Sequence, residues 1–203
     1  MKKIIRKSLE RAISYQEYRI LVSDLLANGK STGPNQSEAL TNYSLLNDKR
    51  MKRLDKTIQI SEETKEAFQQ IKQKQTWLIL TEGWCGDAAQ NIPVIYKMAE
   101  VNENIDLKIV LRDEHLALMD LFLTNGGRAI PKLIAVDEEQ NVLYTWGPRP
   151  AEAAKMLAEY KEMPGVKDSE LKKDLQVWYN KNKGQSIQQD FVNNLILNVV
   201  SDV

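Results

Sequence analysis

The sequence contains only one cysteine, Cys85, and one histidine, His115, among 203 residues. A single cysteine excludes a disulfide within the chain and a zinc site built from several thiolates, so we expect no metal site. Three roles remain for Cys85: a buried filler, a partner in an intermolecular disulfide, or a reactive thiol. Lys and Arg number 28, as do Asp and Glu, and the formal net charge is zero. Since no global field draws such a chain to nucleic acid or an anionic membrane, we expect neither as a partner.

Long apolar runs are also missing. The longest, such as Trp77 to Leu80, are far too short to span a bilayer. The basic start Met1–Ile5 resembles the beginning of a signal peptide, but Arg6, Lys7 and Glu10 interrupt the apolar stretch that such a signal needs. We therefore expect a cytoplasmic protein, in agreement with the scarcity of cysteine. A hydrophobic fraction of 42% is sufficient for a real core.

The expected elements divide the chain into three parts. Residues 1–60 form an N-terminal helical extension, with one helix over 4–27 and a second that begins after Ser37 as its cap. Residues 61–163 alternate between helices and strands and form the central domain. Residues 164–203 carry two further helices, which we expect to pack on the core or to provide a homodimer face.

The central part predicts an α/β fold. Helices are expected over 62–74, 88–101, 114–123 and 151–163, and strands over 76–81, 105–111, 132–136 and 142–146. Strands separated by helices indicate parallel pairing, and the final two strands form a hairpin that adds an antiparallel edge. The prediction is a mixed four-stranded sheet flanked by helices, with additional N-terminal and C-terminal helices.

One loop carries the chemistry, Trp84-Cys85-Gly86-Asp87-Ala88. Cys85 follows a central strand directly and begins a helix, where unpaired N–H groups and the positive helix end favour a thiolate. We therefore expect a lowered pKa for Cys85. Gly86 lets another chain approach the sulfur, and Trp84 provides an apolar wall. This arrangement suits thiol–disulfide exchange.

The same residues resemble the active-site loop of thioredoxin-like proteins. Trp-Cys-Gly follows the first core strand, Pro93 lies in the next helix, and Ile130-Pro131 directly precedes the penultimate strand. The string Gly-Trp-Cys-Gly-Asp-Ala-Ala-Gln is particularly similar to a bacterial subgroup of this family. The resemblance covers residues 61–163 and implies the thioredoxin fold. It also implies a cis Pro131 that faces Cys85 and exposes the Ile130 backbone for pairing with a bound peptide.

Three positions depart from the family's pattern. The second cysteine falls on Ala88, the usual proline on Asp87, and the buried acid on Ile79. Without a resolving cysteine, a mixed disulfide at Cys85 needs an external thiol, such as glutathione or another protein. The Asp87 carboxylate opposes thiolate formation, and Glu82 is a candidate substitute for the missing acid. We do not expect ordinary dithiol reductase activity.

Two functions follow from the resemblance. In the first, Cys85 is the nucleophile of a single-thiol redox protein that needs no cofactor and acts on a protein disulfide or a low-molecular-weight thiol. In the second, the protein is a redox-inactive thioredoxin-fold binding or scaffold module. The residues expected to dock the substrate or partner are Trp84, Gly86, Asp87, Ile130 and Pro131.

Several side chains have two interpretations. Asp87 either contacts a bound partner or caps the helix that follows it. Arg128 either holds an anionic partner, such as a glutathione carboxylate, or forms a surface salt bridge. His115 either pairs with Cys85 as a catalytic dyad or is an ordinary residue at a helix start.

Overall fold

The computed structural model describes residues 1–165 and 167–201. Its sheet has four strands in the order β2-β1-β3-β4, with β1 and β2 parallel and the other neighbouring pairs antiparallel. The strands are β1 (Gln75–Thr81), β2 (Ile105–Leu111), β3 (Lys132–Val136) and β4 (Val142–Trp146). The predicted α/β fold with a mixed four-stranded sheet flanked by helices is confirmed.

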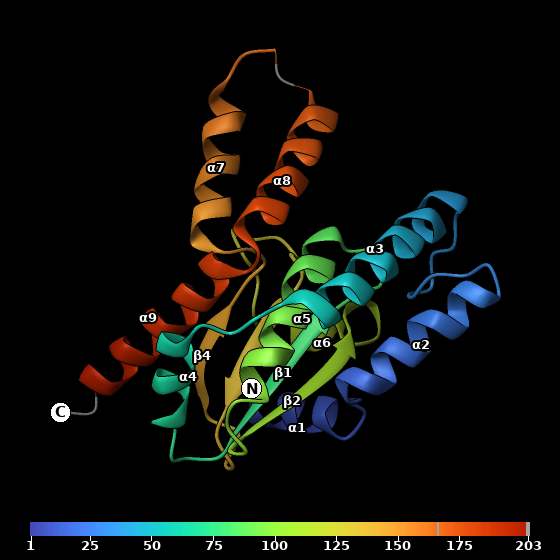
Figure 1. Ribbon diagram of the computed structural model, residues 1–203. Coiled ribbons are helices and arrows are strands. Elements are labelled where there is room, and N and C mark those ends of the chain that lie inside the picture. The colour runs from blue at the N-terminus through green and yellow to red at the C-terminus, as the bar shows by residue number, and fades with distance from the viewer. Residues whose placement is uncertain (166, 202–203) are drawn as a thin grey trace.

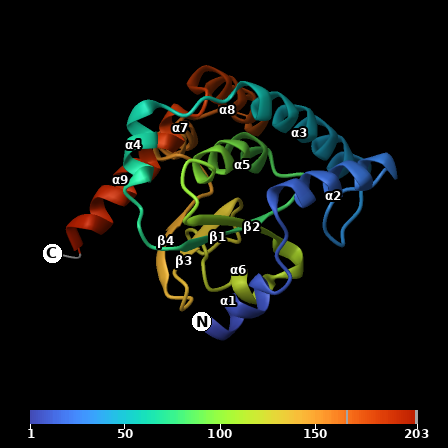
Figure 2. The same ribbon diagram turned by 60° about the horizontal axis from the view of Figure 1, so that its bottom comes forward.

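Helices cover both faces of this sheet (Figures 1 and 2). On one face α5 lies against the strands, with α3, α4 and α9 packed around it, while α1 and α6 cover the other face. The helices are α1 (Lys2–Leu9), α2 (Tyr15–Ala27), α3 (Glu38–Thr57), α4 (Glu62–Gln69), α5 (Gly86–Ala99), η1 (Arg112–Glu114, a 3-10 turn), α6 (Leu116–Met119), α7 (Ala151–Glu162), α8 (Asp168–Asn182) and α9 (Gln185–Ser201). None of the described helices is long and apolar enough to cross a membrane.

Strand β1 lies at the centre of the sheet because its sequence is apolar on both faces. Residues Trp77 to Leu80 are fully buried, as a central strand covered by helices requires. Phe191 of α9 packs on two tryptophan rings: its ring centroid lies 5.1 Å from that of Trp77 and 5.6 Å from that of Trp146. The main core therefore reaches from the sheet into the C-terminal helices.

The predicted single helix over 4–27 is wrong, since the chain forms α1 and α2 with an extended segment between them. Ile13 pairs with Ile109 in both directions, N–H to carbonyl oxygen, at 2.9 and 2.8 Å. This pairing adds a short antiparallel bridge to the exposed edge of β2. Ser14 then caps α2, and its side chain and that of Glu17 form a capping box.

Two central helices are shorter than predicted. Helix α4 ends at Gln69, where the side-chain amide of Asn102 donates to the carbonyl oxygens of Phe68 and Ile71 at 2.7 and 2.9 Å. One bond satisfies a carbonyl group in the last turn of α4, and the other holds the turn that follows the helix. In the segment 114–123, His115 has φ −125° and ψ 42°, which is outside the helical region. Only the short α6 forms after it.

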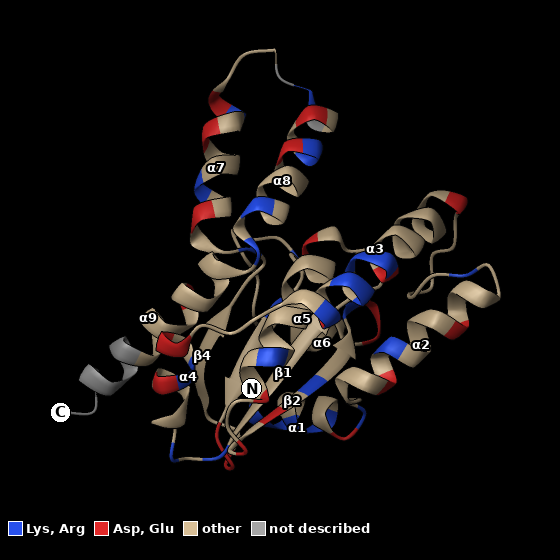
Figure 3. Cartoon of the chain, viewed as in Figure 1, with Lys and Arg blue, Asp and Glu red and all other residues tan. Residues whose placement is uncertain are grey.

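Helices α7 and α8 form a hairpin that projects from the body, as Figure 1 shows. Their contact surface has a small core of its own, made by Ala153, Leu175 and Tyr179. Basic and acidic residues both occur along the two helices (Figure 3). The C-terminal half of α8 contacts α5 beside the loop that carries Cys85, through Gln176 and Tyr179.

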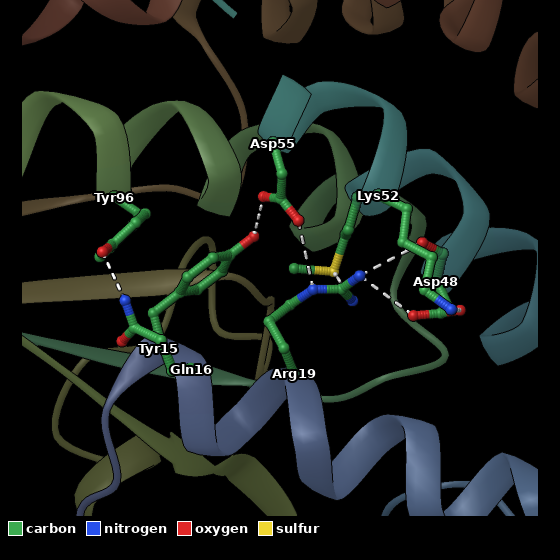
Figure 4. Close-up of polar contacts among 8 residues, drawn as sticks. Tyr15, Gln16, Arg19, Asp48, Lys52, Asp55 and Tyr96 are labelled. Carbon is green, nitrogen blue, oxygen red and sulfur yellow. Dashed lines mark hydrogen bonds and ion pairs between the residues drawn. The ribbon is translucent and has the colours of Figure 1, made fainter. Parts of the chain in front are cut away.

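A polar cluster joins α2 to α3 (Figure 4). Arg19 pairs with Asp48 at 3.0 Å and with Asp55 at 3.5 Å, and the hydroxyl of Tyr15 donates to Asp55 at 2.5 Å. The ring of Tyr15 also stacks on that of Tyr96 of α5, with the ring centroids 4.4 Å apart. These contacts fix α2 and α3 on the face of the sheet that carries α5.

Candidate functional site

Cys85 lies at the junction of β1 and α5 and faces the loop before β3. Its thiol donates a hydrogen bond to the carbonyl oxygen of Ile130 at 3.2 Å, and Sγ accepts from the N–H of Ala88 at 3.5 Å. The Ile130–Pro131 peptide bond is cis. The fold therefore brings Cys85 to the Ile130–Pro131 segment at the N-terminal end of α5, although 45 residues separate Cys85 from Ile130 in the sequence. Only 8% of the surface of Cys85 is exposed.

The predicted lowering of the Cys85 pKa is wrong in this structure. Burial, together with the nearby Asp87 carboxylate, raises the pKa of Cys85 to about 12. The N–H groups of Ala88 and Asp87 and the charge of Arg149 act in the opposite direction, but their effect is smaller. A helix N-terminus thus fails to produce a thiolate because the same packing that places the sulfur there removes it from water.

Asp87 is held by groups from the C-terminal half of the chain. Its Oδ2 lies 2.7 Å from Nη2 of Arg149, and its Oδ1 accepts from the hydroxyl of Tyr179 at 2.9 Å. The side-chain amide of Asn91 donates to the Tyr179 hydroxyl oxygen at 3.0 Å. Burial raises the pKa of Asp87, although Arg149 and Tyr179 favour its ionised form. Cys85 is the N-cap of α5, so the interpretation of Asp87 as the cap is wrong.

Trp84 and Gly86 are the half-buried residues of the loop, whereas Cys85, Asp87 and Ala88 are buried. The Arg112 guanidinium lies over the half-buried Trp84 ring, 4.9 Å from its centroid. A Cβ atom at Gly86 would lie 3.7 Å from Nε2 of Gln176 and 3.8 Å from Nη1 of Arg50. Gly86 therefore lies between α8 and α3.

Residues from the N-terminal part of the chain form hydrogen bonds with the backbone just before this loop. The side-chain amide of Asn47 donates to the carbonyl oxygen of Gly83 at 3.0 Å, and the Gly83 N–H donates to Oγ1 of Thr32 at 2.8 Å. Arg50 in turn donates to Oδ1 of Asn47 at 2.9 Å. Sequence reasoning did not find these residues, since no local pattern shows which loop a buried Asn or Thr will support.

Glu82 is fully buried beneath the same loop. Its Oε1 accepts from the N–H of Asp113 at 2.9 Å, and burial raises the pKa of its carboxyl. Among the residues that the structure describes, no hydrogen bond joins this carboxyl to Cys85. The geometry therefore adds nothing to its expected role as a substitute acid.

His115 and Arg128 are engaged elsewhere. Nδ1 of His115 lies 2.9 Å from Oγ of Ser8, in the contact between α1 and the start of α6. Arg128 forms a bidentate pair with Asp120, at 2.6 and 2.8 Å. The alternatives that the structure supports are thus a packed residue at a helix start for His115 and a surface salt bridge for Arg128.

A family model described as thioredoxin matches residues 33–161. The chain belongs to the thioredoxin family. The match begins before the predicted boundary at residue 61 and so includes α3 of this thioredoxin-like protein. No curated protein matches the chain.

Two solved structures resemble most of the chain. One is a protein of unknown function from Pseudomonas aeruginosa, with a TM-score of 0.56 and 18% identity, over 90% of this chain and 97% of that one. The other is an HIV epitope scaffold, with a TM-score of 0.53 and 18% identity, over 90% of this chain and 98% of that one. At this identity the likeness shows the fold alone. It extends over most of the chain, well beyond the sheet and its nearest helices.

Proposed function

We propose that this thioredoxin-family protein is a binding or scaffold module that uses the thioredoxin groove without disulfide turnover. The observation that carries the proposal is the buried thiol of Cys85, which donates its hydrogen to the Ile130 carbonyl oxygen at 3.2 Å. The partner docks on the half-buried Trp84 and Gly86, beside the Ile130–Pro131 segment, which is itself buried.

Two chemical requirements of disulfide exchange are unmet in this arrangement. The attacking group is a thiolate, and a thiol whose pKa is about 12 is almost fully protonated at neutral pH. The position of the resolving thiol is occupied by Ala88, which is itself buried. A protein disulfide that reached the groove would thus meet neither the attacking thiolate nor the second thiol of a reductase.

A second candidate function is single-thiol exchange, supported by the N–H of Ala88 that points at Sγ from 3.5 Å. When a docked partner rearranges this loop and lets water reach Cys85, desolvation falls and the thiol can lose its proton to solvent. The thiolate then attacks one sulfur of a protein disulfide, a mixed disulfide forms, and the other sulfur leaves as a thiolate. An external thiol such as cytoplasmic glutathione attacks the mixed disulfide, takes the partner's sulfur and restores Cys85.

The reaction of Cys85 with iodoacetamide at pH 7 separates the two functions. A pKa near 12 makes the thiolate scarcer than in free cysteine by about three orders of magnitude, and higher nucleophilicity recovers part of this loss. For the binding module we expect alkylation about a hundredfold slower than that of free cysteine. A rate equal to or above that of free cysteine would reject the module and support exchange.

A further inference from the structure

Two hydrogen-bond donors converge beside the first residue of α5. Around the position that a Cβ of Gly86 would occupy, Nη1 of Arg50 lies at 3.8 Å and Nε2 of Gln176 at 3.7 Å. Arg50 comes from α3 and Gln176 from α8, so helices from both ends of the chain supply the two donors. Since Gly86 has no side chain, its own residue places no atom between the two donors.

Both donors lack an acceptor for most of their N–H groups. Arg50 donates only to Oδ1 of Asn47, at 2.9 Å, within the part of the chain that the structure describes. Gln176 uses its Oε1 to accept from Gln90 at 2.9 Å, and its Nε2 has no acceptor among the described residues. The remaining N–H groups of this half-buried guanidinium are therefore available to a ligand.

Arg50 also has no ion-pair partner among the residues that the structure describes. No described carboxylate lies within ion-pair distance of Arg50. The charged group that acts on Arg50 is another cation, Arg53. Arg53 donates a hydrogen bond to Oδ1 of Asn180 at 2.8 Å. By contrast, Arg19 on the neighbouring helix is paired with both Asp48 and Asp55 (Figure 4). Figure 3 shows this part of α3 as a basic band that runs beside α5.

The carboxylate nearest in sequence to this space does not fill it. Asp87 follows Gly86 directly, but its two oxygens are bound by Arg149 and Tyr179. The Asp87 charge is therefore paired with groups other than Arg50 and Gln176.

We propose that Arg50 and Gln176 bind an oxyanion, a carboxylate or phosphate group, carried by the ligand that docks on the loop at Gly86. A planar guanidinium fits such a group with two parallel hydrogen bonds, and the amide of Gln176 supplies a third donor from the opposite side. The inference rests on the proposed docking function and deepens it, because it makes the docked partner negatively charged next to Gly86.

The test is a titration of the ¹⁵N-labelled Cys85→Ser protein, followed by amide chemical shifts. One arm adds sodium phosphate and a second adds sodium acetate, each compared with sodium chloride at equal ionic strength. We expect saturable shifts of the Gly86 N–H and of the Gln176 side-chain amide. Arg50→Gln should weaken the binding by about tenfold or more, since it removes a charged donor. Lys49→Gln removes the same charge from an exposed neighbour and should leave the affinity within about twofold.

Each outcome decides the proposal. Saturation with phosphate alone or acetate alone supports it and identifies the group that the partner carries. Shifts that match those in chloride, or equal losses in Arg50→Gln and Lys49→Gln, overturn it. If Arg50→Gln does not fold, Gln176→Ala tests the opposite side of the same space and should also weaken binding. Since Cys85→Ser has no thiol, a failure here is separate from a failure of the proposed function, which alkylation measures.

Discussion

Tyr179 of α8 donates its hydroxyl hydrogen to Oδ1 of Asp87, in the first turn of α5, at 2.9 Å. The bond joins the C-terminal helices to the loop that carries Cys85, across 92 residues of sequence. Both Asp87 and the Tyr179 hydroxyl lie in a buried environment that also holds Asn91. The loop that carries Cys85 is therefore held by a contact that residues 61–163, the predicted central domain, could not make alone.

Replacement of Tyr179 by Phe tests the strength of this contact. The change keeps the ring in the small core of α7 and α8 but leaves Oδ1 of Asp87 and the Asn91 amide with one partner fewer. We expect a loss of about 1–2 kcal/mol in the free energy of unfolding, measured with urea. Tyr160→Phe is the matched control, because the Tyr160 hydroxyl donates to Asp174 on the same hairpin at 2.6 Å. A loss at Tyr179 no larger than that at Tyr160 would contradict the buried contact.

The strands and the centre of the site could be predicted from the sequence. The bounds of β2, β3 and β4 agree with those predicted, because apolar runs ended by turn residues mark them. The place of Cys85 between a strand and a helix identifies it as the site residue, a resemblance adds Pro131, and the structure brings the two together as that resemblance implies. The capping box of Ser14 and Glu17, which divides the first predicted helix, was present in the sequence and was overlooked.

The remainder of the site depends on tertiary packing. Helical periodicity shows which face of α3 or α8 is apolar, but not that Arg50 and Gln176 will meet at Gly86. The pKa of Cys85 depends on its burial in the main core and on the Asp87 carboxylate, whereas local sequence shows only the helix N-terminus, which acts in the opposite direction. For these reasons the direction of the shift was predicted wrongly.

Asp87→Asn should make the thiol more reactive. The Asp87 carboxylate raises the pKa of Cys85, and Arg149, which lowers it, would lose its ion-pair partner. Both effects favour the thiolate, so we expect iodoacetamide to alkylate Cys85 severalfold faster at pH 7 than in the wild type. Asp120→Asn removes an exposed carboxylate that pairs with Arg128, away from the thiol, and should leave the rate unchanged. An unchanged rate in Asp87→Asn would show that burial alone sets the pKa.

Glu82→Gln should change how stability depends on pH. Because burial raises the pKa of Glu82, the folded protein holds this proton more tightly than the unfolded chain does. The resulting stability is full below the ordinary value of 4.5 and is lost as the pH rises through the raised, folded-state pKa. Gln keeps an acceptor for the Asp113 N–H without the buried charge. In urea unfolding, Glu82→Gln should therefore gain stability over the wild type between pH 4 and pH 7.

The control for the comparison of Glu82→Gln with the wild type is Glu114, an exposed residue that follows Asp113 directly. Glu114→Gln should follow the wild type at both pH values, since little of its surface is removed from water on folding. A difference between Glu82→Gln and the wild type that stays constant with pH would mean that Glu82 keeps its ordinary titration in the fold.

Ala88→Cys restores the two-thiol spacing of the family and tests whether the groove is open. Ala88 is 1% exposed, and its N–H lies 3.5 Å from Sγ of Cys85, so the two thiols would be adjacent at the start of α5. We expect no reduction of insulin disulfides by this variant, because Cys85 stays covered and its pKa stays high. The double variant with Asp87→Asn lowers that pKa and is the more sensitive form of the same assay. Insulin reduction by Ala88→Cys alone would show that only the second thiol is missing, and single-thiol exchange would then replace the binding module as the better account of Cys85.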